Sequence, residues 1–129
     1  MTDKEYNLTS NKIKTLIKKW YVPVGFGWWR TDFIYSSERK PDNENTAAET
    51  HADFKYSHAT ITFYVPILAT MSDEELEHTF VHELCHITAS TYPDFQDNND
   101  AVSRFERTVD DFAKQMIWAR QAGVKDAKV

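Results

Sequence analysis

The chain has 129 residues, of which 41% are hydrophobic and 14% aromatic, and it contains three glycines. This composition predicts one globular domain, residues 1–129, that can bury a hydrophobic core, and it excludes a disordered or fibrous protein. The formal net charge of −5 argues against nucleic-acid binding as the main activity.

The N-terminal residues, the lengths of the apolar runs and the number of cysteines indicate the cellular location of the protein. The first ten residues, "MTDKEYNLTS", lack the apolar core of a signal peptide, and no apolar run reaches the roughly 20 residues of a membrane span. The single cysteine, Cys85, excludes a framework of internal disulfide bonds. We therefore expect a cytoplasmic protein without a membrane partner.

The N-terminal half predicts one helix and two strands. Thr2 and Glu5 have the spacing of a capping box, and apolar residues then follow a helical period, so we expect a helix over about 3–20. The segments "FGWWRTDFIYSS" (26–37) and "FKYSHATITFYV" (54–65) are predicted strands. The second alternates clearly, with one apolar face formed by Ala59, Ile61, Phe63 and Val65. The polar segment 38–53 between them is predicted to be a long loop.

The C-terminal half predicts two amphipathic helices. Ser72 and Glu75 form a second capping box before a helix over about 73–90, whose buried stripe is Leu76, Phe80, Leu84 and Ile87. A final helix, about 100–121, carries a stripe of Val102, Phe105, Val109, Phe112 and Met116, and we expect Gly123 to close it. Since a sheet with one apolar face needs helices to cover it, the predicted class is α+β, with a small twisted sheet.

The stretch "FVHELCHIT" (80–88) places two histidines four residues apart, with a glutamate directly after the first. On a helix, His82 and His86 lie one turn apart and can direct their imidazoles to one point, which suits zinc. Glu83 is rotated by about 100° from His82, so it lies beside the metal, where a carboxylate can take a proton from water. The motif therefore predicts two zinc ligands and one general base.

A catalytic zinc site needs a third protein ligand and one open position. No histidine follows His86, but the last helix contains "RFERTVDDF", in which Glu106 and Asp110 share a face. Glu106 can complete the coordination, and Asp110, one turn later, can hydrogen-bond a ligand histidine and fix its tautomer. The alternative for this pair is two solvated carboxylates on an amphipathic helix.

His-Glu-x-x-His on one helix, followed by Glu-x-x-x-Asp on another, resembles the gluzincin, or thermolysin-like, group of zincin metallopeptidases. The resemblance covers residues 54–118 and is nearest to the minimal, single-domain members that are frequent in bacteria and their phages. It implies that His82, His86 and Glu106 bind zinc, that Glu83 is the base and that Asp110 supports the first histidine. It also implies that an edge strand, here 58–65, packs against the motif helix and binds a peptide substrate. The pattern lacks the third histidine that the metzincins and the SprT-like proteins use.

We therefore expect a zinc-dependent hydrolase of peptide bonds. Two rival hypotheses are a zinc-containing binding or regulatory module of the same fold, and a metal-free interaction domain. Tyr92 is a candidate for stabilising the oxyanion, although a packed aromatic residue is the more common role. His78 and His82 form a rival metal-binding pair. The other candidates are a buried Cys85 and possible groove positions at His51 and His58.

Overall fold

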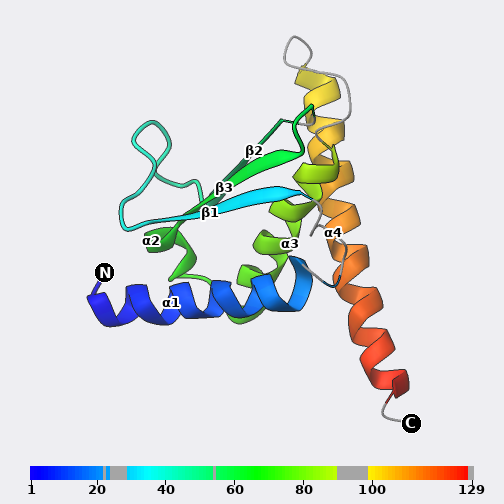
Figure 1. The fold of residues 1–129 in the computed structure, drawn as a ribbon, viewed down its shortest axis with the longest axis horizontal. Coiled ribbons are helices and arrows are strands. Elements are labelled where there is room, and N and C mark those ends of the chain that lie inside the picture. The colour runs from blue at the N-terminus through cyan, green and yellow to red at the C-terminus, as the bar shows by residue number, and fades with distance from the viewer. Residues whose placement is uncertain (22, 24–28, 54, 90–98, 128–129) are drawn as a thin grey trace.

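The computed structural model describes residues 1–21, 23, 29–53, 55–89 and 99–127. It is an α+β fold, as predicted (Figure 1). The elements in chain order are helix α1 (Asp3–Leu16) with a π-helical continuation η1 (Ile17–Tyr21), strands β1 (Arg30–Ser36), β2 (Ala48–Asp53) and β3 (His58–Tyr64), a short helix α2 (Val65–Leu68), the motif helix α3 (Asp73–Ala89) and helix α4 (Asn99–Ala127).

The three strands form one mixed sheet in the order β1-β3-β2. Strand β1 pairs in parallel with β3, and β2 pairs with it in antiparallel orientation. The expectation of an edge strand at 58–65 is therefore wrong, because β3 is hydrogen-bonded along both sides. Among the described strands, β2 is the edge strand beside α3, and it lies in the segment that the polar composition predicted to be a loop.

The alternation of apolar and polar side chains along β3 determines which face of the sheet the helices cover. Ala59, Ile61 and Phe63 are buried, as predicted, and the residues between them are half-buried on the opposite face. In β2, Thr50 is paired with Ile61, and residues paired across two strands share a face. The small side chains of β2 (Ala48, Thr50 and Ala52) therefore face the helical layer, while Glu49 and His51 face away from it.

Both predicted capping boxes are at helix N-termini. The Thr2 hydroxyl accepts a hydrogen bond from the Glu5 amide at 3.1 Å at the start of α1. At the start of α3, the Glu75 amide donates to the Ser72 hydroxyl at 3.2 Å, and the Ser72 amide donates to the Glu75 carboxylate at 3.4 Å. These bonds satisfy amides that have no partner within the helix, so each helix begins where the sequence predicts.

Helix α3 is the central helix of the core. Its predicted stripe of Leu76, Phe80, Leu84 and Ile87 is buried throughout. The Phe80 ring stacks on that of Phe63 in the central strand, with centroids 6.0 Å apart. The neighbours of α3 are β2, α4 and α1. Because the apolar stripe is directed into the core, the histidines on another side of the helix face the space between β2 and α4.

Helix α4 differs from its prediction in length and in its buried face. It continues through Gly123 to Ala127, and its C-terminal turns extend past the sheet (Figure 1). A glycine in a helix costs only about 1 kcal/mol relative to alanine, so it weakens this helix without ending it. Val109 is buried as predicted, but Phe112 is 50% exposed and Ala113 packs into the core instead. None of the helices in the described ranges has the length and apolar character needed to cross a membrane.

Replacing Phe80 by Ala should lower the free energy of unfolding by about 3–5 kcal/mol, because it opens a cavity in the core between α3 and the central strand. Phe112→Ala is the matched control, since that ring is half-exposed, and its cost should be about 1 kcal/mol or less. Urea denaturation followed by circular dichroism measures both. Equal losses in the two variants would contradict the core described here.

Candidate metal centre

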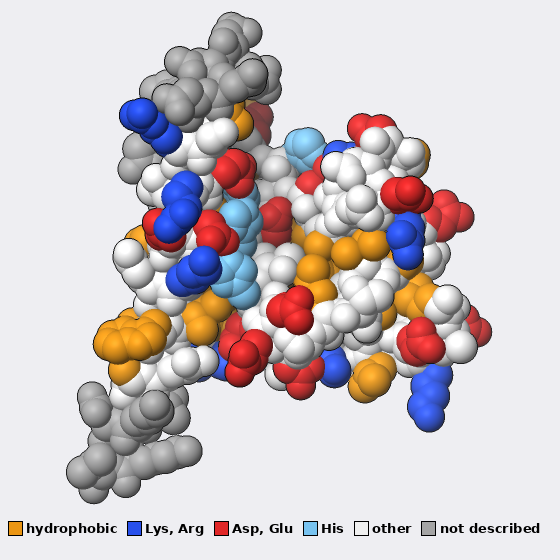
Figure 2. Space-filling model, turned by 180° about the vertical axis from the view of Figure 1, so that it is seen from behind, with side chains coloured by type: hydrophobic (Ala, Val, Ile, Leu, Met, Phe, Trp, Pro, Cys, Tyr) orange, Lys and Arg blue, Asp and Glu red, His pale blue; other side chains and the backbone are white. Residues whose placement is uncertain are grey.

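A cleft of about 510 Å³ lies between α3, α4 and β2. Histidine and acidic side chains gather along this hollow beside the long C-terminal helix (Figure 2). Helix α3 forms its floor, and α4 and the edge strand form its walls. The residues that line it are Ala47, Ala48, Glu49, Thr50, His78, Thr79, His82, Glu83, His86, Glu106 and Asp110.

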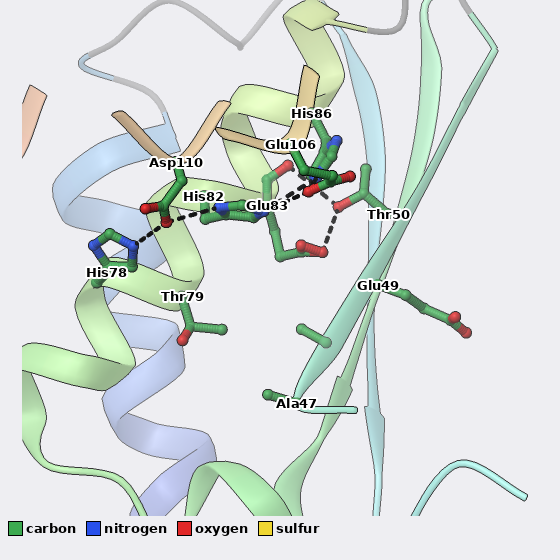
Figure 3. Close-up of a pocket in the computed structure, with 11 residues that line it drawn as sticks. Ala47, Glu49, Thr50, His78, Thr79, His82, Glu83, His86, Glu106 and Asp110 are labelled. Carbon is green, nitrogen blue, oxygen red and sulfur yellow. Dashed lines mark hydrogen bonds and ion pairs between the residues drawn. The ribbon is translucent and has the colours of Figure 1, made fainter. Parts of the chain in front are cut away.

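The three predicted metal ligands converge in this cleft. The Nε2 atoms of His82 and His86 lie 3.2 Å apart. One carboxylate oxygen of Glu106, Oε2, lies 3.4 Å from His82 Nε2 and 3.5 Å from His86 Nε2. The histidines come from successive turns of α3 and the glutamate from α4 (Figure 3). The packing of these two helices therefore brings together residues that are twenty positions apart in the chain.

The spacing of these three atoms fits a tetrahedral zinc ion. Ligands at about 2.0–2.1 Å from a tetrahedral centre are about 3.3–3.4 Å from one another, which matches the observed separations. The Glu106 oxygen is too far from either ring for a strong hydrogen bond. Burial lowers the pKa of His86, so its imidazole tends to be neutral, as a metal ligand must be. His82, His86 and Glu106 thus form a donor set suited to zinc.

Asp110 lies on the other side of His82. Its Oδ1 atom is 3.5 Å from His82 Nδ1, the ring nitrogen that points away from Glu106. The same oxygen accepts a shorter hydrogen bond, 2.7 Å, from His78 Nε2, and Oδ2 is 3.1 Å from Lys114 Nζ. The hydrogen bond from His78 is the main reason that the pKa of Asp110 falls to about 2. Asp110 is therefore a carboxylate at neutral pH. It lies near Nδ1 of His82, but the histidine that hydrogen-bonds it is His78.

The rival pair of His78 and His82 has a different geometry. His78, His82 and Asp110 also lie within reach of one ion, and the Asp110 oxygen of that group is 3.5 Å from Nδ1 of His82. The 2.7 Å contact between His78 and Asp110 is a hydrogen-bond distance, shorter than the roughly 3.3 Å that separates two ligands of a zinc ion. His78 is therefore better described as a partner of Asp110 than as a ligand.

Glu83 has the environment of a general base. Its side chain is only 6% exposed, although it borders the cleft. Burial is the main cause that raises the pKa of Glu83 to about 7, and the nearby Glu106 and Glu49 carboxylates add to it, whereas a hydrogen bond from Thr50 opposes it. A carboxyl group with a pKa near neutrality can accept and release a proton at physiological pH.

Of the remaining sequence candidates, the described ones lie outside this centre. Tyr92 lies outside the described residues. His58 pairs with Asp32 at 3.0 Å, and His51 is an exposed residue of β2 rather than of a loop. Cys85 is buried as predicted, with its sulfur 3.7 Å from that of Met116, and burial raises the pKa of its thiol to about 11. Its position is that of a packing residue.

The sequence prediction missed the contribution of β2 to the site. Thr50 donates a hydrogen bond to Glu83, and the Glu49 side chain points away from Glu83 (Figure 3). Glu49 contacts Tyr64 and Lys40 instead. The segment "AETHAD" does alternate small and polar side chains, which is the signal of a strand with one buried face. Its alanines and threonine are too small to give this signal the strength of an aliphatic strand.

Comparison of the chain with protein-family models, with curated proteins and with solved structures found no match. The function is therefore inferred from the residues of the site alone.

The raised pKa of Glu83 predicts how the stability of the metal-free protein depends on pH. In the unfolded chain this carboxyl ionises near its ordinary pKa of about 4.3, whereas in the folded protein it keeps its proton to about pH 7. Between these values the folded state binds more protons, so the free energy of unfolding falls as pH rises. Glu83→Gln removes this dependence.

The unfolding free energy of Glu83→Gln minus that of wild type should therefore increase by about 3 kcal/mol between about pH 4 and pH 8. Urea denaturation in the presence of a chelator measures it. A difference that stays constant across this range would show that Glu83 ionises normally in the fold.

The ligand geometry predicts a ranking of zinc affinities. Glu106→Ala should abolish tight binding, because it leaves only two protein ligands. Asp110→Ala should weaken binding by about 10–100-fold, the usual effect of losing a carboxylate that orients a ligand histidine. Asp111→Ala is the matched control, since that carboxylate pairs with Arg107 instead. Titration against a competing zinc indicator measures all three, and unchanged affinity in Glu106→Ala would overturn the ligand set.

Proposed function

We propose that this protein is a zinc-dependent metallopeptidase that resembles the gluzincins. The observation that carries the proposal is the convergence of His82, His86 and Glu106, with 3.2–3.5 Å between their ligand atoms, next to the buried carboxylate of Glu83. A purely structural zinc site has four protein ligands and no need of a base. Here the described residues supply three ligands and a base at an open cleft.

The residues divide the chemistry between them. When bound, zinc would act as a Lewis acid on the scissile carbonyl and lower the pKa of a water molecule. Glu83 accepts the proton of the attacking water and delivers it to the leaving amine. Asp110, whose Oδ1 lies 3.5 Å from Nδ1 of His82, would orient that ring when zinc is bound, and the hydrogen bond from His78 holds Asp110 in place.

The substrate of this proposed enzyme is a peptide in extended conformation. Strand β2 is the edge strand beside the cleft, and its backbone borders the metal ligands at Ala48, Glu49 and Thr50. A peptide that adds to this edge would gain main-chain hydrogen bonds without a demand for one sequence. We therefore propose that the substrate pairs with β2 (48–53) and not with the central strand at 58–65.

A zinc-containing module that binds a partner without cleaving it has the same ligand set. The two functions differ in what they require of Glu83. A binding module gains nothing from a buried carboxylate, which carries a desolvation cost, whereas a peptidase requires a base at this position.

The decisive measurement is digestion of an unbiased peptide library by the zinc-loaded protein. Wild type should cleave the library, a chelator should stop cleavage and added zinc should restore it. Glu83→Gln should retain zinc and lose about 10²–10⁴-fold in rate, because an amide cannot accept the proton. Glu74→Gln, an exposed residue of the same helix, is the control and should cleave at the wild-type rate.

Two results would change the assignment. Undiminished cleavage by Glu83→Gln would rule out its role as the base. Stoichiometric zinc binding with no cleavage of any peptide by wild type would support the binding module instead.

A further inference from the structure

The edge strand contacts the proposed base directly. The hydroxyl of Thr50 lies 3.3 Å from Oε1 of the Glu83 carboxylate and 3.2 Å from the backbone carbonyl oxygen of the same residue. Figure 3 shows the Thr50 side chain pointing from β2 toward Glu83. The two residues are 33 positions apart in the chain, so this contact is created by the fold.

Thr50 is the polar residue on the inner face of β2. Its neighbours on this face are Ala48 and Ala52, and its cross-strand partner is the fully buried Ile61. Thr50 is half-buried and borders the cleft, and its hydroxyl contacts Glu83 of α3.

A hydroxyl is suited to hold a group that gains and loses a proton. It can donate one hydrogen bond and accept two. When Glu83 is a carboxylate, Thr50 donates to Oε1. When Glu83 carries the proton, the carboxyl donates to the Thr50 oxygen, and Thr50 donates to the Glu83 carbonyl oxygen. The side chain of Glu83 therefore has the same partner before and after proton transfer.

We propose that Thr50 is a positioning residue that fixes the Glu83 carboxylate at the metal centre, an inference that rests on the proposed peptidase function. A base must be within hydrogen-bond reach of the proton it removes, and a misplacement of about 1 Å can cost about 10²-fold in rate. Because Thr50 belongs to the strand that borders the cleft, the same element aligns the peptide and the base. Thr50 acts through Glu83 and not on the substrate.

The first test compares Thr50→Val, which keeps the β-branched shape and removes the hydroxyl, with Thr50→Ser, which keeps the hydroxyl. In the zinc-loaded full chain, Thr50→Val should lose about 10–100-fold in kcat, with KM and zinc affinity close to wild type. Thr50→Ser should recover most of the loss. Thr62→Val, on the opposite face of the sheet, is the matched control and should match wild type.

A kcat loss that serine does not rescue, or that is matched by loss of zinc affinity, would overturn the positioning role. So would an unchanged kcat in Thr50→Val.

A second test does not depend on hydrolysis. A double-mutant cycle in unfolding equilibrium combines Thr50→Val with Glu83→Ala in the metal-free protein. In the alanine background the Thr50 hydroxyl can still donate to the carbonyl oxygen of residue 83, so the coupling measures what the Glu83 carboxyl group adds to that contact. Thr50→Val should raise the unfolding constant of the wild-type protein, and its effect on the unfolding constant of Glu83→Ala should be smaller by a factor of at least about three.

The two tests separate the two proposals. Strictly additive effects in the cycle, with an active wild type, would overturn the role of Thr50 alone. The other informative result is a cycle that shows coupling while the wild-type protein binds zinc and cleaves no peptide. That pair of results would overturn the peptidase function and, with it, the catalytic role of Thr50.

Discussion

The packing of α3 against α4 is the constraint on which the site depends. Two of the proposed ligand atoms belong to residues of α3 and the third to a residue of α4, and their separations of 3.2–3.5 Å leave little freedom for the helices to slide. A shift of one residue along α4 would rotate Glu106 away by about 100°. The core contacts of Leu84, Val109 and Ala113 therefore fix the register of the two helices, and with it the shape of the centre.

The chemistry of the site has an energetic cost in the absence of a cation. Glu83 is buried, and the negative charge of Glu106 is near enough to raise its pKa further. The hydrogen bond from Thr50 and a bound divalent ion both act in the opposite direction, because each stabilises the carboxylate. Burial and the nearby Glu106 charge disfavour an ionised Glu83 in the metal-free fold. By raising its pKa, they also make Glu83 suitable for accepting a proton near neutral pH. Stability and the proposed activity thus depend on the same few groups.

Local sequence patterns predicted the parts of the fold that local interactions determine. The capping box at Ser72 begins α3 because its bonds form within one turn, and the stripe around Phe80 is buried because helical period alone sets which residues share a face. The His-Glu-x-x-His spacing determined that His82 and His86 share a side of the helix for the same reason. The sequence also indicated Glu106 and Asp110 as candidates, since they lie one turn apart on the next helix.

Only the tertiary structure decided which strand borders the site and which groups surround Glu83. The aliphatic alternation of β3 predicts a strand in either a central or an edge position, and pairing on both sides, which depends on distant segments, placed it at the centre. Strand β2 has small and polar side chains, so its formation depends on pairing with β3 and packing on α3 rather than on its own hydrophobicity. The contact of Thr50 with Glu83 follows from that pairing. No spacing within the sequence encodes it, because a hydrogen bond between residues so distant in the chain exists only after both elements have found their places in the fold.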